Sequence, residues 1–119
     1  MRLNEIEFGG SPPVDSYGPG GFRIADVWYD GSLIVLPSAV HSLPVMSIQE
    51  LTPLIAEGSE IDVVLIGQGP DIAPLNQEIR EAIENSGPGV EIMSTPSACR
   101  TYNVLLAEDR RVAAILTAL

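Results

Sequence analysis

The chain has 119 residues, which fits a single domain spanning residues 1–119. Its six basic residues are all arginine and stand against 16 acidic residues, so the formal net charge is −10. Without lysine, the chain cannot use Schiff-base, P-loop or kinase-type lysine chemistry. The acidic balance argues against nucleic acid and anionic membranes as partners. One cysteine excludes an intrachain disulfide, and with one histidine it cannot form a Cys/His zinc site alone.

The first 21 residues are rich in glycine and proline. We expect them to form an extended arm with turns and a short strand near Leu3–Phe8. The sequence begins with neither a signal-peptide nor a transit-peptide pattern. Its most apolar stretch, Val112–Leu119, is far shorter than the roughly 18 residues that a membrane span needs. These features predict a cytoplasmic protein without membrane insertion.

A β-hairpin is predicted after the arm. Two runs rich in β-forming residues, Phe22–Tyr29 and Ser32–Pro37, flank the dipeptide Asp30-Gly31. Asp-Gly is typical of the two-residue type I′ turn, in which both residues have positive φ. The pattern therefore predicts an antiparallel hairpin with its turn at Asp30-Gly31.

Helical and strand patterns alternate over the rest of the chain. The final run, Arg110–Leu119, fits either a helix or a buried strand, and its periodicity does not decide between them. The alternation predicts an α/β domain with a mainly parallel sheet. The other expected elements are a helix from the capping box at Ser47 to Gly58, a strand at Asp62–Ile66, a helix from Pro74 to Gly87, a strand at Val90–Met93, and a helix with Thr95 as N-cap.

Gly67-Gln68-Gly69 matches the first part of a dinucleotide-binding fingerprint. As that fingerprint requires, it follows a predicted strand and precedes a predicted helix. The third glycine of that fingerprint is missing, since Ile72 occupies its place. A partial match of this kind favours an ordinary strand-to-helix turn over nucleotide binding. Cys99 lies near a predicted helix start and beside Arg100, and both features lower the pKa of a thiol. The alternative is a small helix residue that packs in the core.

A binding crevice is predicted where two strands end. If Asp62–Ile66 and Val90–Met93 are parallel neighbours, the helices that start near Ala73 and Pro96 direct their N-termini to one crevice. Helix N-termini favour anions, so we expect a small anion or an acidic side chain of a partner there. Local capping of the backbone is the alternative. The candidate residues are Gly67, Gln68, Gly69, Thr95, Ser97, Cys99 and Arg100.

Several segments resemble a small family of domains of unknown function from bacteria and archaea. The main one is Ser-Thr-Pro-Ser-Ala-Cys-Arg-Thr-Tyr-Asn-Val-Leu-Leu at residues 94–106, followed by Arg-Arg-Val-Ala-Ala at 110–114. Tyr17–Ile24, Asp30–Pro37 and Ile66–Gly69 add to the resemblance. The family's eukaryotic member is mitochondrial NADH dehydrogenase (complex I) assembly factor 3. The resemblance covers nearly the whole chain.

The resemblance implies a three-layer α/β fold around a mixed sheet with one strand antiparallel to the rest. It also implies that the last run, from about Arg111, is a strand. No catalytic residue or cofactor is implied, and the best-understood member binds other proteins during complex I assembly. Two positions depart from the family. Ser42–Val45 stand where a tryptophan is common, and Gln68 stands where threonine is common.

These observations favour a non-enzymatic protein-binding domain, by resemblance a complex I assembly factor. The expected partners are complex I subunits or other assembly factors, and the arm and the hairpin are the expected contact elements. A second class stays open, in which the crevice around Gly67, Gly69, Cys99 and Arg100 binds a small molecule or anion or supports a minor enzymatic activity. A structural homo-oligomer is a third.

Overall fold

The computed structural model describes residues 5–7 and 11–119, so the predicted arm lies partly outside the described residues. A six-stranded sheet has the order β1-β6-β5-β9-β7-β8, and a three-stranded sheet has the order β2-β3-β4. Strand β1 falls within the short strand predicted near Leu3–Phe8. The main sheet consists of β1 (Glu5–Glu7), β5 (Leu33–Val35), β6 (Ala39–Ser42), β7 (Val63–Gly67), β8 (Gly89–Met93) and β9 (Val112–Leu116).

The main sheet is mixed, as predicted. Strand β7 runs parallel to both of its neighbours, β8 and β9. Strand β5 is antiparallel to β6 and β9, and β1 is antiparallel to β6 at the edge of the sheet. The final run of the chain is therefore a strand, as the family resemblance implied, and it lies in the middle of the sheet.

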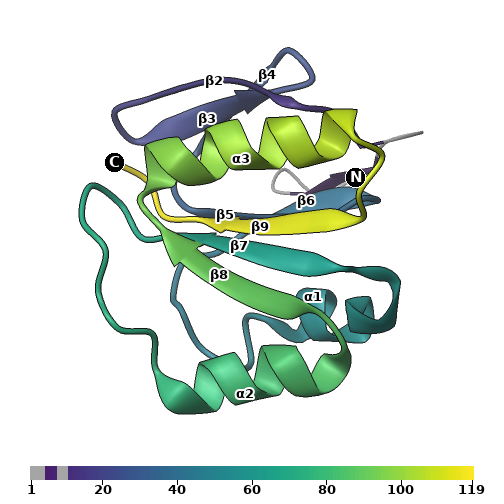
Figure 1. Ribbon diagram of the computed structural model, residues 1–119. Helices are drawn as coiled ribbons and strands as arrows, with labels where there is room; N and C mark the ends of the chain where they lie inside the picture. Colours follow the sequence, from purple (N-terminus) through teal and green to yellow (C-terminus); the bar gives the residue numbers. More distant parts are fainter. Residues whose placement is uncertain (1–4, 8–10) are drawn as a thin grey trace.

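The main sheet is the middle of three layers (Figure 1). Helix α3 (Thr95–Ala107) and the small sheet cover one face, whereas α1 (Thr52–Ala56) and α2 (Gln77–Ser86) cover the other. Strand β9 has no exposed face, because its residues alternate between the two apolar clusters that fill these interfaces. Such continuous burial explains why its sequence shows no polar periodicity.

The small sheet contains β2 (Val14–Gly18), β3 (Gly21–Ile24) and β4 (Val27–Asp30). A hairpin is present in this region, but it joins β3 to β4 within the run Phe22–Tyr29, and its turn lies at Ala25–Asp26, where φ is 51° and 65°. The predicted pairing of this run with Ser32–Pro37 is absent, because β5 pairs with β6 and β9. The Asp15 carboxylate accepts the N–H of Asp26 over 3.0 Å and supports this left-handed turn. The position predicted for the turn was wrong. Gly31, with φ 82°, instead carries the chain from the small sheet to the main one.

Two helices begin later than predicted. Helix α1 begins at Thr52, because Pro53 lacks an N–H and fits only the first turn of a helix. A 3₁₀ turn, Gly58–Glu60, follows it. Helix α2 begins at Gln77 rather than Pro74, since Asn76 caps it, and it ends before Gly87 as predicted.

Among residues 5–7 and 11–119, no helix has the length and apolarity that crossing a membrane requires.

Candidate functional site

The carboxyl end of β7 meets the start of α3 in a tight corner. A Cβ atom at Gly67 would lie 2.9 Å from the Thr95 Cα and 3.0 Å from the Ala98 Cβ. The N–H of Gly69 donates to the Thr95 hydroxyl over 2.8 Å, and that hydroxyl donates to the Thr117 carbonyl over 2.7 Å. Three predicted site residues, Gly67, Gly69 and Thr95, are thus brought together, and Gly69 and Thr95 hydrogen-bond to one another.

The other predicted polar residues lie around this corner. The Gln68 side chain accepts the N–H of Ala73 over 2.8 Å, and the exposed Arg100 donates to the Ser97 hydroxyl over 3.3 Å. The N-cap of α3 is Ser94, not Thr95. Helices α2 and α3 lie on opposite faces of the sheet (Figure 1). Anion binding at this corner stays a prediction.

Cys99 lies in the core rather than at the corner. Its side chain is 3% exposed and packs in the apolar cluster between α3 and the sheet. Burial raises the pKa of the thiol to about 11, and the opposing influence of the Arg100 charge is smaller. The sequence left two alternatives open, a thiol with a lowered pKa and a residue packed in the core, and the structure supports the second. The thiol is therefore protonated at neutral pH.

We expect Cys99 in the folded protein to react with a disulfide reagent at neutral pH at least about a hundredfold more slowly than free cysteine. Both burial and the raised pKa act in this direction. The release of the coloured thiolate measures the rate, and the unfolded chain in guanidinium provides the control. Equal rates for the folded and unfolded chains would contradict the buried position.

The Ser94–Leu106 motif also ties α3 to strand β2. The Asn103 side chain accepts the N–H of Val14 over 2.8 Å and donates to the carbonyl of Val14 over 2.9 Å. Tyr102 is fully buried, and its hydroxyl donates to the Pro12 carbonyl over 3.5 Å. Together with Thr95, these side chains give the motif a structural role. It ties α3 to β2 on one side and to the residues that follow β7 and β9 on the other.

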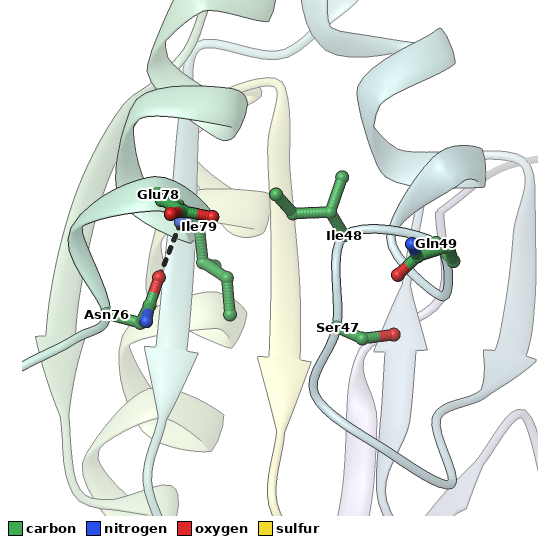
Figure 2. A pocket seen from close by; sticks show the side chains of 6 residues that line it. All are labelled: Ser47, Ile48, Gln49, Asn76, Glu78 and Ile79. Carbon is green, nitrogen blue, oxygen red and sulfur yellow. Dashed lines mark hydrogen bonds between the residues drawn. The ribbon is translucent and has the colours of Figure 1, made fainter.

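A shallow hollow opens on the face covered by α1 and α2, with a volume of about 280 Å³. Figure 2 shows Ile79, from α2, on one side of it and Ile48, from the turn before α1, on the other. The Asn76 side chain accepts the N–H of Ile79 over 3.1 Å. Sequence reasoning missed this site, although Ser47 and Asn76 both carry capping signals. Its lining residues are Ser47, Ile48, Gln49, Asn76, Glu78 and Ile79.

The small sheet exposes the tryptophan patch, which consists of Arg23, Trp28 and Asp30. Trp28 is 40% exposed, and its indole N–H donates to the Asp30 carboxylate over 2.9 Å. The Arg23 guanidinium carbon lies 6.0 Å from the centre of the indole ring. A Cβ at Gly21 would lie 2.7 Å from that ring, so the indole rests on the backbone of Gly21. The patch is therefore held in place on three sides.

Sequence reasoning named the hairpin as a contact element but not Trp28. The alternation of β4 does give a signal, because Tyr29 is buried while Trp28 and Asp30 on either side are exposed. Which of the two faces meets the core follows only from the packing of α3.

The part of the chain that the structure describes holds no group of three or more His, Cys, Asp or Glu side chains placed to bind a metal ion.

Comparisons with known proteins place these features in a family. A protein of Rhodobacter capsulatus described as uncharacterized is 42% identical over 116 residues, covering 98% of this chain and 92% of the relative. NADH dehydrogenase [ubiquinone] 1 alpha subcomplex assembly factor 3 of Danio rerio is 34% identical over 121 residues, covering 98% of this chain and 70% of the relative. The chain spans 57% to 70% of the length of the animal assembly factors that it matches.

The fold is also known from solved structures. The solution NMR structure of a Bordetella pertussis protein described as an Mth938-like domain superimposes with a TM-score of 0.75 at 26% identity, covering 99% of this chain and 92% of that one. The model of the family described as protein of unknown function (DUF498/DUF598) matches residues 14–117. The matched range contains both the tryptophan patch and the β7–α3 corner. The chain belongs to the DUF498/DUF598 family.

Proposed function

We propose that this domain binds another protein through the tryptophan patch and thereby assists the assembly of respiratory NADH dehydrogenase. The observation that carries the proposal is the large aromatic side chain of Trp28, exposed yet fixed by Asp30, Arg23 and the Gly21 backbone. Tryptophan and arginine are the residue types that most often dominate binding energy at protein interfaces. An anchor that is already immobile loses little conformational entropy on binding.

The likeness to assembly factors supports the biological context of this binding. The animal relatives carry that description, and the zebrafish protein matches 98% of this chain. The charge around the patch favours a basic partner surface, because Asp15, Asp26 and Asp30 are exposed on the small sheet beside a single arginine. Complementary charge would steer such a partner toward the patch.

The test compares baits that differ only at the patch. Tagged wild-type protein and the variant Trp28→Ala are purified from cells of the species that makes the protein, and NADH dehydrogenase subunits that copurify are quantified by mass spectrometry. We expect the variant to recover at least about tenfold less of these subunits, as loss of a tryptophan anchor implies. Val104→Ala removes another exposed apolar side chain, on α3, and should recover the wild-type amount.

Trp28 also covers Gly21, so each bait is first compared with wild type by urea unfolding. Arg23→Glu serves as the second patch variant, because it keeps the indole and reverses one exposed charge. Wild-type recovery by both patch variants would overturn the proposed surface. Failure of the wild-type protein itself to recover NADH dehydrogenase subunits above an untagged control would overturn the assembly role.

A further inference from the structure

Strand β8 forms a free edge of the main sheet. It pairs with β7 on one side, and no strand of residues 5–7 and 11–119 lies on its other side. Figure 1 shows β8 at the rim of the sheet, with α3 on one face and α2 on the other. With five residues, it is as long as its neighbour β7. An edge of this length presents unpaired main-chain groups to which another chain can hydrogen-bond.

The register identifies which main-chain groups point outward. The N–H of Gly89 donates to Asp62, and the carbonyl of Met93 accepts from Gln68, so both residues direct their main-chain groups toward β7. In a parallel pair, alternate residues direct these groups to opposite sides. The N–H and C=O groups of Val90 and Ile92 therefore point to the free edge. Outside the sheet, no group of the described residues bonds to them.

The side chains of β8 divide between the two faces of the sheet. Val90 and Ile92 are partly buried against the apolar cluster on the α2 side. Glu91 alternates with them, pairs with Leu65 in register, and is exposed on the α3 side. A strand added at this edge would bring apolar side chains beside Val90 and Ile92 and one side chain beside Glu91.

Charge identifies the kind of strand that fits. Glu91 is the central residue of β8, so two copies of this chain that pair their β8 edges antiparallel about that residue would place two carboxylates side by side. A net charge of −10 further disfavours the second copy. A basic side chain beside Glu91 would instead form an attractive cross-strand pair.

We propose that the free edge of β8 receives an extended segment of a partner protein, which adds to the main sheet as a further strand and places an arginine or lysine beside Glu91. The added strand hydrogen-bonds to the main chain of Val90 and Ile92 and continues the apolar surface on the α2 side. This edge belongs to the main sheet, whereas the tryptophan patch belongs to the small sheet, so the inference stands independently of that patch.

The test uses two synthetic peptides as probes. In both, valine alternates with threonine, and the central residue is arginine in one and glutamate in the other. Binding to the whole isotope-labelled protein is followed by amide signals in NMR titrations. We expect the arginine peptide to shift the Val90 and Ile92 signals, to slow hydrogen exchange of these amides about tenfold, and to bind about tenfold more tightly than the glutamate peptide.

Matched variants separate the main-chain and charge contributions. Val90→Pro removes an outward N–H without removing a bond to β7, and we expect about tenfold weaker binding, whereas Val90→Ala should stay within about threefold of wild type. Glu91→Arg should reverse the preference and favour the glutamate peptide. Trp28→Ala should bind both peptides as wild type does. Unchanged signals for β7 and β9 identify variants that still fold.

Four results would overturn the proposal. They are equal affinity for the two peptides, equal affinity of Val90→Pro and Val90→Ala, signal shifts centred on β4 instead of β8, and self-association of the free protein that protects the Val90 and Ile92 amides. The last result would identify a second copy of the chain as the occupant of this edge.

Discussion

Replacing Thr95 by valine is expected to lower the free energy of unfolding by about 3 kcal/mol. Valine has nearly the shape of threonine, so packing changes little, but the hydroxyl that bonds to Gly69 and Thr117 is lost. Because Thr95 is fully buried, water cannot replace either bond. The N–H of Gly69 and the carbonyl of Thr117 would both lose the partner that Thr95 now provides.

Thr95→Ser is the matched control, because serine keeps the hydroxyl and loses only a buried methyl group. Its cost should be about 1 kcal/mol. Urea unfolding curves measure both variants, and similar slopes for the two allow their midpoints to be compared directly. A serine variant as unstable as the valine variant would mean that packing, and not hydrogen bonding, holds the corner together.

Replacing Tyr102 by alanine is expected to cost about 4 kcal/mol, which is typical of a large aromatic side chain removed from a core. Tyr102 is fully buried in the cluster that joins α3, the small sheet and the main sheet. Its hydroxyl makes a single long bond to Pro12, at 3.5 Å. Tyr102→Phe should therefore lie within about 1 kcal/mol of wild type in urea unfolding at neutral pH.

The same residue gives an alkaline pH dependence. Burial raises the pKa of Tyr102 from 10.0 to about 12, so the folded state favours the neutral phenol. The resulting stability is fully present below pH 10 and is lost as the pH rises from about 10 to about 12, because the unfolded chain ionises first. Tyr102→Phe should lose less stability over this range. An identical loss in both proteins would assign the effect to another group, such as Tyr29, whose pKa burial also raises.

The sequence is informative where structure depends on local patterns. The strands β7 and β8, the end of α2 at Gly87 and the inward face of α3 all follow from apolar spacing and glycine positions. The pairing of β5 with β9 does not, because these strands are far apart in the chain and neither carries a signal for the other. The hairpin turn was misplaced because Ala25 adopts a left-handed conformation in which glycine or asparagine is usual.

The predicted site also contains features that the sequence could show and features that it could not. Gly67 and Gly69 lie at the end of β7 and meet Thr95 at the start of α3, and that proximity could be foreseen. The burial of Cys99 could also have been inferred, since it follows Thr95 by four residues and precedes Tyr102 by three, the spacing of one helix face. The exposure of Trp28 could not, because it depends on which face of the small sheet packs on α3.

The position of β9 has a consequence for the making of the protein. Of the described strands, it is the one that the ribosome synthesises last, yet it separates β5 from β7 at the centre of the main sheet. Until residues 112–116 have emerged, β5 and β7 have no shared neighbour. The apolar cluster that α3 covers also lacks the side chains that β9 contributes to it. The nascent chain therefore exposes apolar strands until its synthesis has passed β9, and this domain cannot complete its fold before then. A partner that recognises the folded surface accordingly selects chains whose translation has passed that point.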